Sequence, residues 1–315
     1  MEERLLALLR LAIKFNATDI HFEEKYSEIT IDMRINGSFH RVKSKIGDDK
    51  LIRYLQYLSN LDIGKLLQPQ TGQFEMEVDG TLLSLRFAVI NNVNYTNGVL
   101  RILNSKIKID AENLSLFKSQ NEYFKSLLEE DSGLIVFSGP TGSGKTTTLY
   151  SLLKSVKNKK IFTIEDPIEV YNDNFIQLQI NETTGFDYEE GIKQILRHDP
   201  DIIMVGEIRD QKAAKMAVVA ANTGHLVLTT IHASSSKSVI SRLTELGVNE
   251  NHLYEVLLCL TNQRMMITSD NNKAVLYEIM NKEEIEYYKE NKKNSDNFIS
   301  LKNQIKKGKD NGLFI

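Results

Sequence analysis

Residues 137–148 read FSGPTGSGKTTT and fit the pattern G-x-x-x-x-G-K-[ST]. The apolar residues 134–137 predict a buried parallel strand before it, and residues 147–156 predict a helix after it. In this order of strand, loop and helix, backbone N–H groups and the positive helix N-terminus attract phosphate anions. The sequence therefore predicts a P-loop that binds a nucleoside triphosphate, with ATP and Mg²⁺ as cofactors.

The residues of this loop have separate expected roles. The N–H groups of residues 142–145 are expected to surround the β-phosphate, while the Lys145 ammonium reaches the β- and γ-phosphate oxygens and the Thr146 hydroxyl holds Mg²⁺. A chance match or an inactive relic is the alternative, which the flanking strand and helix disfavour. The predicted nucleotide-binding residues here are Gly139, Thr141, Gly142, Ser143, Gly144, Lys145, Thr146 and Thr147.

Composition indicates a soluble globular protein of two domains. The 315 residues are 41% hydrophobic and 26% charged, which is ordinary for this class. The formal net charge of −3 provides no global basic field for direct nucleic-acid binding. Cys259 is the single cysteine, so a disulfide within the chain is excluded, and its apolar surroundings predict a core residue. Without an apolar run of ~20 residues or a signal-peptide cleavage site, we expect a cytoplasmic protein that docks on a membrane through a partner.

Hydrophobic periodicity predicts two domains of different class. Residues 1–104 combine two helical patterns with alternating strand patterns and turns at Asn36-Gly37 and Asp79-Gly80, which predicts a small α+β domain with a mostly antiparallel sheet. Residues 105–119 are polar and predict a linker. In residues 120–315, strands and helices alternate, which predicts an α/β domain with a parallel sheet and helices on both faces, followed by a carboxy-terminal helical part.

Two short apolar strands end in acidic residues. The strand at 201–205 leads into Gly206 and Glu207; Gly206 occupies the usual Asp position, so Glu207 is the carboxylate left to organise Mg²⁺, partly through water. The strand at 161–164 leads into Glu165, which is suited to orient or deprotonate the attacking water if that strand neighbours the P-loop strand. The alternative is that these acids only solvate loops or strand ends.

Two histidines bracket the apolar strand at 226–231. His225 and His232 are seven residues apart, which places them at opposite ends and on opposite faces of the strand and makes them poor ligands for one metal ion. His232, at the carboxyl end, is the better candidate for contacting the γ-phosphate, and His225 is the weaker one. A structural histidine is the usual alternative.

The order and spacing of four segments resemble a known family. Residues 139–148, 163–169, 201–210 and 223–232 are similar to the Walker A motif, the Asp box, the atypical Walker B motif and the His box of the type II secretion and type IV pilus assembly ATPases. Residues 17–23 (ATDIHFE) and 68–74 (QPQTGQF) resemble two amino-terminal motifs of the same family. The resemblance covers nearly the whole chain and implies a RecA-like P-loop ATPase domain with a smaller amino-terminal α+β (PAS-like) domain.

The resemblance also implies an assembly and further site residues. It implies a homohexamer with nucleotide between the two domains and near the next subunit, where arginines of the amino-terminal domain stabilise the phosphates. Arg86 and Arg101 stand at the matching strands, and the His box adds His225 to the nucleotide-binding set. Arg34, Arg209 and Arg264 are weaker candidates, with surface ion pairing as the alternative. The expected catalytic residues are Glu165, Glu207, Lys145, His232, Arg86 and Arg101.

Two differences from the pattern of this family indicate a subtype. One cysteine cannot form the paired C-x-x-C module found in many family members, and the chain begins close to residues 17–23. Both features resemble the short competence-type ATPases of Gram-positive bacteria, which power a pseudopilus for DNA uptake. The resemblance therefore implies an assembly motor whose partner is an inner-membrane platform protein, with DNA as the cargo of the machine rather than a ligand of this chain.

Three other functions stay open. A pilus retraction ATPase is disfavoured because residues 263–266 and 274–279 resemble assembly members. A non-hydrolysing nucleotide-dependent adaptor is disfavoured by the intact Lys145, Glu165 and Glu207, and a P-loop kinase by the absence of an evident lid segment in the sequence.

Overall fold

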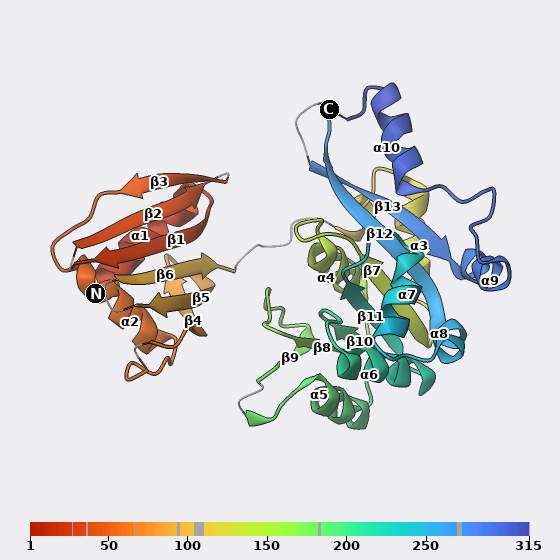
Figure 1. Cartoon of the computed structure of the whole chain (residues 1–315), viewed down its shortest axis with the longest axis horizontal. Helices are drawn as coiled ribbons and strands as arrows, with labels where there is room; N and C mark the ends of the chain where they lie inside the picture. Colours follow the sequence, from red (N-terminus) through yellow and green to blue (C-terminus); the bar gives the residue numbers. More distant parts are fainter. Residues whose placement is uncertain are drawn as a thin grey trace. The chain divides into compact units, whose positions relative to one another are not determined.

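The computed structural model describes residues 1–26, 28–35, 37–65, 67–92, 95–103, 110–181, 184–269 and 273–314. The chain divides into two compact units, formed mainly by residues 1–106 and by residues 107–315, and each contains its own sheet (Figure 1). The predicted boundary after residue 104 lies outside the described residues, as does the predicted turn residue Asn36, so both stay predictions. The end of the predicted linker is structured, because it contains the 3-10 turn η2 (Ala111–Asn113) and the start of helix α3 (Lys118–Leu127).

The amino-terminal unit is a six-stranded sheet with two helices. All its strand pairs are antiparallel, in the order β3-β2-β1-β6-β5-β4, which agrees with the predicted α+β class. The turn at Asp79-Gly80 joins β4 to β5, and both residues have positive φ angles of 50° and 76°, as a tight hairpin requires. The elements are α1 (Glu2–Lys14), β1 (Ala17–Lys25), β2 (Glu28–Ile35), β3 (Ser38–Val42), η1 (Asp48–Lys50), α2 (Leu51–Leu58), β4 (Gln70–Val78), β5 (Thr81–Asn91) and β6 (Tyr95–Ile102).

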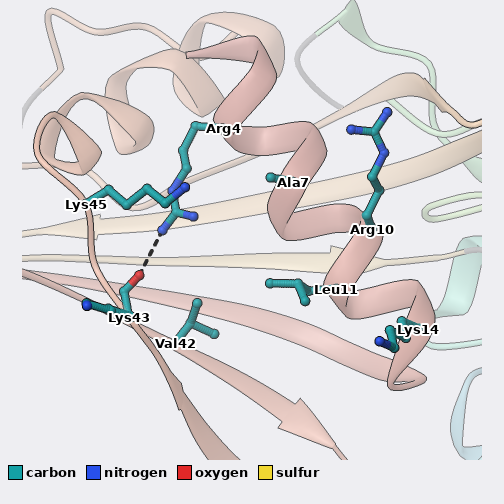
Figure 2. Close-up of a pocket in the computed structure, with 8 residues that line it drawn as sticks. All are labelled: Arg4, Ala7, Arg10, Leu11, Lys14, Val42, Lys43 and Lys45. Atoms are coloured by element: carbon teal, nitrogen blue, oxygen red, sulfur yellow. Dashed lines mark hydrogen bonds between the residues drawn. The ribbon is translucent and has the colours of Figure 1, made fainter.

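Helix α1 closes the core of this unit. Its apolar face buries Leu5, Leu8 and Leu9 in the same cluster as side chains of the sheet. Its outer surface carries basic side chains, which Figure 2 shows beside the segment after β3. Arg4 connects α1 with the segment after β3, because its guanidinium donates to the Asp48 carboxylate at 2.8 Å. The helix is thus held by burial on one face and by a charged hydrogen bond at its edge.

The carboxy-terminal unit is a seven-stranded sheet in the order β13-β12-β7-β11-β10-β8-β9. Every pair is parallel except β12 with β13, so this is the predicted α/β domain with an antiparallel edge strand. Its strands are β7 (Gly133–Ser138), β8 (Ile161–Glu165), β9 (Phe175–Gln179), β10 (Ile202–Val205), β11 (Leu226–Ile231), β12 (Leu257–Ile267) and β13 (Lys273–Asn281). Its further helices are α4 (Lys145–Ser155), α5 (Tyr188–Ile195), η4 (Leu196–His198), α6 (Gln211–Asn222), α7 (Ser238–Glu245), α8 (Glu250–Val256), α9 (Lys282–Asn291) and α10 (Leu301–Asp310).

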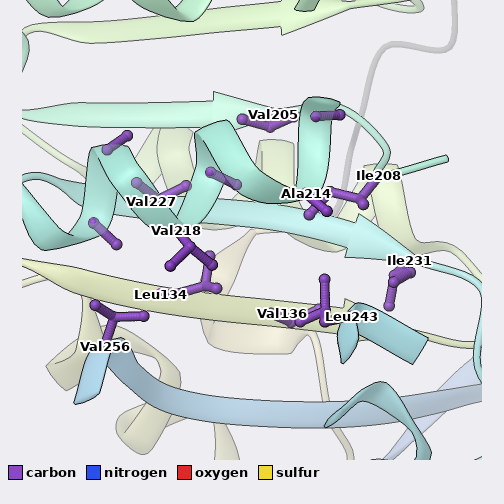
Figure 3. Packing of buried hydrophobic residues seen from close by; sticks show 14 of the residues in the cluster. Leu134, Val136, Val205, Ile208, Ala214, Val218, Val227, Ile231, Leu243 and Val256 are labelled. Atoms are coloured by element: carbon purple, nitrogen blue, oxygen red, sulfur yellow. The ribbon is translucent and has the colours of Figure 1, made fainter. Parts of the chain in front are cut away.

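Helices cover both faces of this sheet. On one face, Ala214 and Val218 of α6 share a buried cluster with Leu134 and Val227 of the central strands (Figure 3). Strand β8 shows the alternation between faces, since Ile164 belongs to this cluster whereas Glu165 contacts α4. The central strands are buried on both sides, which explains their nearly continuous apolar sequences.

Two elements near the carboxyl end were not predicted from the sequence, and they matter for the site. Strand β12 lies beside β7, the strand that leads into the P-loop, and β13 forms the adjacent edge. Cys259 lies in β12 and is fully buried, as predicted for a core residue, and this burial raises the pKa of its thiol to about 12. Across the described part of the chain, none of the helices has the length and apolar character that a membrane span requires.

Candidate nucleotide-binding and catalytic site

The P-loop lies between β7 and α4. The strand ends at Ser138 and the helix begins at Lys145, two residues earlier than predicted. Gly142 and Gly144 have φ angles of 77° and 89°, in the left-handed region where a residue with a Cβ is strained. The loop therefore depends on glycine to turn its backbone into α4. Its N–H groups lie at the positive N-terminus of that helix, where they can bind an anion.

Lys145 folds back across this loop. Its Nζ donates to the carbonyl oxygens of Gly139 at 3.0 Å and Pro140 at 3.3 Å, and the residue is only 9% exposed. Thr146 follows in the first turn of α4 and is half-buried, as is Thr147, whereas Thr141 at the loop tip is exposed. The structure thus brings the predicted residues of this segment together at one helix N-terminus.

Glu207 and His232 join the P-loop at the carboxyl ends of β10 and β11. The His232 ring lies between two acceptors: its Nδ1 is 3.1 Å from the Gly139 carbonyl oxygen, and its Nε2 is 2.8 Å from Glu207 Oε1. Arg209 donates from Nε to Glu207 Oε2 at 2.8 Å, and this bond raises the pKa of Arg209. The start of the P-loop and the acidic motif are therefore linked through one histidine.

A close packing contact explains why Gly206 occupies the position where the acidic motif usually has Asp. A Cβ at this position would lie 3.2 Å from Glu165 Cγ, which is a tight contact. Gly206 also donates from its N–H to the Ile164 carbonyl and accepts at its own carbonyl from the Thr230 hydroxyl. The missing side chain allows β8 and β10 to end close together, and it places the carboxylate one residue later, at Glu207.

Glu165 was expected to orient the attacking water if its strand neighboured the P-loop strand, and the sheet does not meet this condition. Strand β8 does not neighbour the P-loop strand, because β11 and β10 lie between them in the sheet. The Glu165 carboxylate is buried, and its Oε1 accepts hydrogen bonds at 2.7 Å from the Tyr150 hydroxyl of α4 and the Thr163 hydroxyl. It therefore connects the helix after the P-loop to the sheet, and its role toward water stays a prediction.

His225 lies at the other end of β11. Its Nδ1 is 3.3 Å from the Ala220 carbonyl oxygen at the end of α6, and its own carbonyl accepts from the Gly133 N–H at the start of β7. The six residues of β11 separate His225 from His232 by ~20 Å at the rise of a strand. Within this unit, the structure does not bring His225 to the P-loop, so its nucleotide-binding role rests on the resemblance alone.

Arg86 and Arg101 are cross-strand partners in the amino-terminal sheet. Their Cα positions pair between β5 and β6, and Arg101 also pairs with Asp19 of β1. Arg101 Nε donates to Asp19 Oδ1 at 2.7 Å. Burial raises the pKa of Asp19, but the hydrogen bonds from Arg101 and Thr18 outweigh burial and leave it below its usual value. The sequence pattern found both arginines but not the aspartate that holds one of them.

The donor set fits a magnesium ion. Mg²⁺ prefers oxygen ligands and keeps several waters, which suits the Thr146 hydroxyl together with a carboxylate acting through water. The Glu207 carboxylate is 18% exposed, so solvent reaches it. Among the described residues, no group of three or more His, Cys, Asp or Glu side chains has the arrangement of a protein-only metal site.

Comparison with known proteins identifies the family. The family model "Type II/IV secretion system protein" matches residues 1–305. Competence protein ComGA of Bacillus subtilis is 37% identical over 264 residues, which cover 82% of this chain and 74% of that protein. Type II secretion system protein E of Pectobacterium carotovorum is 35% identical over 83% of this chain and 54% of its own length.

A solved structure agrees with the sequence matches. The crystal structure of the pilus retraction motor PilT with bound ADP aligns with a TM-score of 0.78 at 25% identity, covering 98% of this chain and 94% of the other. These matches confirm the predicted family and the RecA-like fold. The chain belongs to the type II/IV secretion system protein family, a family of secretion ATPases.

Proposed function

We propose that this chain is an ATP-hydrolysing motor that works as a homohexamer at the cytoplasmic face of a membrane and powers assembly of a competence pseudopilus or a similar filament. One observation carries the proposal: His232 connects the Gly139 carbonyl of the P-loop with the Glu207 carboxylate. A nucleotide bound by the loop is thereby next to a carboxylate and an imidazole ring that respond to its γ-phosphate.

Binding uses the loop and Lys145. The N–H groups of the loop and the dipole of α4 attract the phosphates. Lys145 exchanges its contacts with the Gly139 and Pro140 carbonyls for contacts with phosphate oxygens, which attract an ammonium more strongly than neutral carbonyls do. The Thr146 hydroxyl and Glu207 would hold Mg²⁺, which neutralises charge on the phosphates when bound.

Hydrolysis requires a positioned water and stabilisation of the developing charge. Glu207 is the carboxylate beside the P-loop network, and we assign it the orientation of that water, either directly or through the ion. His232 stabilises charge on the γ-phosphate. Because it contacts both Glu207 and the P-loop, it also transmits the loss of the γ-phosphate to the loop. Glu165 supports this arrangement from beneath α4 through Tyr150.

The amino-terminal arginines would complete the site in the assembly. Arg86 and Arg101 are adjacent on one sheet face, and Arg101 is 57% exposed despite its bond to Asp19. An arginine supplied to a P-loop site contributes ~10³- to 10⁵-fold in rate. Mechanical work follows if phosphate release weakens these contacts and moves one unit against the other. The force would be passed to a membrane platform protein.

Assembly is favoured over retraction by sequence. The competence protein of Bacillus subtilis is 37% identical to this chain, whereas the PilT retraction motor is 25% identical. The shared fold does not separate the two directions. Expression in a competence-deficient strain that lacks its own assembly ATPase tests the direction: restored DNA uptake supports assembly, and loss of existing filaments supports retraction.

The first experiment is ATP hydrolysis per subunit against protein concentration, with Lys145→Ala and Arg101→Ala in parallel. We expect a steep rise with concentration that both substitutions abolish, since the active site needs the P-loop lysine and the neighbour's arginine. Activity that is independent of concentration would contradict sites shared between subunits. Nucleotide binding without hydrolysis at any concentration would favour the adaptor function instead.

A further inference from the structure

The P-loop rests on strand β12, an element that no motif predicted. The last pair between β7 and β12 joins Ser138 to Asn262, so the next residue of β12, Gln263, lies beside the first residue of the loop. Gln263 is fully buried. Asn262 secures the same place, because its Nδ2 donates to the Ser138 hydroxyl and to the Ala233 carbonyl directly after His232, both at 2.9 Å.

Gln263 contacts the loop at both ends. Its Nε2 donates to the Ser143 carbonyl at 2.7 Å. A Cβ added to Gly139 would lie 2.6 Å from the Gln263 carbonyl oxygen, so the first glycine of the loop packs directly on its backbone. A Cβ on Gly144 would lie 3.6 Å from Gln263 Nε2. One residue therefore contacts the loop with its backbone at the entry and with its side chain near the start of α4.

These contacts fix the direction in which the loop presents its N–H groups. A loop that offers successive N–H groups to an anion must turn its carbonyls away, and each buried carbonyl then needs another donor. Lys145 donates to the Gly139 and Pro140 carbonyls until it turns to the phosphates, whereas Gln263 donates to the Ser143 carbonyl throughout. Without the amide donor, the Ser143 peptide loses the bond that holds its carbonyl away from the phosphate position.

We infer that Gln263 is a positioning residue for nucleotide binding: it holds the Ser143 peptide so that the P-loop N–H groups face the phosphates. The inference rests on the proposed nucleotide-binding function. Because the phosphates are bound in both the ground state and the transition state, the contact contributes to affinity rather than to the chemical step. Loss of the amide should therefore raise KM for ATP and leave kcat nearly unchanged.

The test compares two glutamines that make the same type of bond. Gln304 of α10 also donates from Nε2 to a backbone carbonyl, that of Tyr277 at 2.8 Å, and the Oε1 atoms of both glutamines are buried without a partner among the described residues. Gln263→Met removes the bond to Ser143, and Gln304→Met removes the bond to Tyr277 together with a longer one to the Ile299 carbonyl at 3.3 Å; both substitutions keep the length of the side chain. Binding of a fluorescent ADP analogue, ATPase kinetics and the thermal midpoint are measured for both variants and for the wild type.

We expect a ~5- to 10-fold weaker affinity and a matching rise in KM for Gln263→Met, as loss of one buried hydrogen bond implies, and wild-type values for Gln304→Met. Unchanged affinity of Gln263→Met would overturn the inference, as would equal loss in both variants. Failure of the wild type to bind the ADP analogue would instead overturn the proposed function, so the two failures are distinguishable.

A second variant keeps the test decisive if Gln263→Met does not fold. Gln263→Glu has the same shape, but its ionised carboxylate faces the Ser143 carbonyl and cannot donate to it. Protonation of the buried carboxyl at acidic pH restores a donor. The affinity ratio between wild type and Gln263→Glu should therefore narrow as the pH falls from 8 to 5.5, whereas a constant ratio would contradict the positioning role.

Discussion

At the scale of single residues, two carboxylates are candidates for orienting the attacking water, and they differ in their exposure to solvent. Glu207 follows the carboxyl end of β10 and lies between His232 and Arg209, where its side chain is 18% exposed. Glu165 is 2% exposed and accepts from Tyr150 and Thr163. A group that orients water needs access to water, which favours Glu207.

Glu207→Gln is therefore expected to lower kcat at least ~100-fold, since it removes the charge that orients water and supports the ion, while binding of an ADP analogue is retained. Steady-state ATPase and equilibrium binding measure the two effects. Glu165→Gln is the comparison: a lower thermal midpoint with partial activity is expected. Full loss of turnover in Glu165→Gln with an unchanged midpoint would reverse the assignment.

A second expectation concerns the first glycine of the loop. Gly139→Ala places a methyl group 2.6 Å from the Gln263 carbonyl, which is backbone and cannot move aside cheaply. The loop must shift, and we expect loss of nucleotide binding with little loss of fold. Gly142→Ala provides the contrast, because a Cβ there meets nothing within 4 Å and the cost is limited to its left-handed φ. Equal affinities of the two variants would contradict the steric account.

At the scale of elements, the regular strands and helices were largely predictable, whereas the strand order was not. Periodicity located β7, β10 and β11, because each is an apolar run ended by turn residues. It did not show that two strands, β11 and β10, separate β8 from β7, since neighbours in a sheet are set by long-range packing. Strand β12 was missed because polar and apolar residues do not alternate regularly in its second half, Gln263 to Ile267. Gln263 was consequently missed as well.

Helix α1 offers a prediction that depends on pH. Burial raises the pKa of Asp48, but the hydrogen bond from Arg4, the Lys45 N–H and the charge of Arg4 together leave that pKa below its usual value. A lowered carboxyl pKa stabilises the fold above the unfolded pKa of about 3.9 and loses this effect as the pH falls through the folded value.

Asp48→Asn should therefore lower the free energy of unfolding by about 1–3 kcal/mol at pH 7, and the difference from wild type should shrink below about pH 4. Thermal unfolding followed by circular dichroism at several pH values measures this effect. Asp79→Asn is the control, because the pair formed by Arg10 and Asp79 is exposed on both sides and is expected to contribute little. A constant difference at all pH values would contradict the ion-pair explanation.

At the scale of the whole molecule, the proposed hexamer predicts complementation between inactive subunits. Lys145→Ala subunits retain Arg101, and Arg101→Ala subunits retain the P-loop. If the arginine acts on a neighbour's nucleotide, mixed assemblies contain some complete sites, and the mixture should recover a measurable fraction of wild-type ATPase activity. Activity is measured after mixing and reassembly at equal ratios. No recovery, with mixed assembly shown by crosslinking, would place the arginine and the P-loop of one site in the same subunit.

Tyr277 of β13 connects the end of the chain with the helix that follows the P-loop. Its hydroxyl is 2.8 Å from the Thr148 hydroxyl of α4, and its carbonyl accepts from Gln120 of α3 and Gln304 of α10. For protein engineering, β13 is consequently a poor insertion point. A label inserted into β13 would displace the Tyr277 hydroxyl from α4 and disturb enzyme kinetics, so labels for microscopy belong on exposed loops elsewhere.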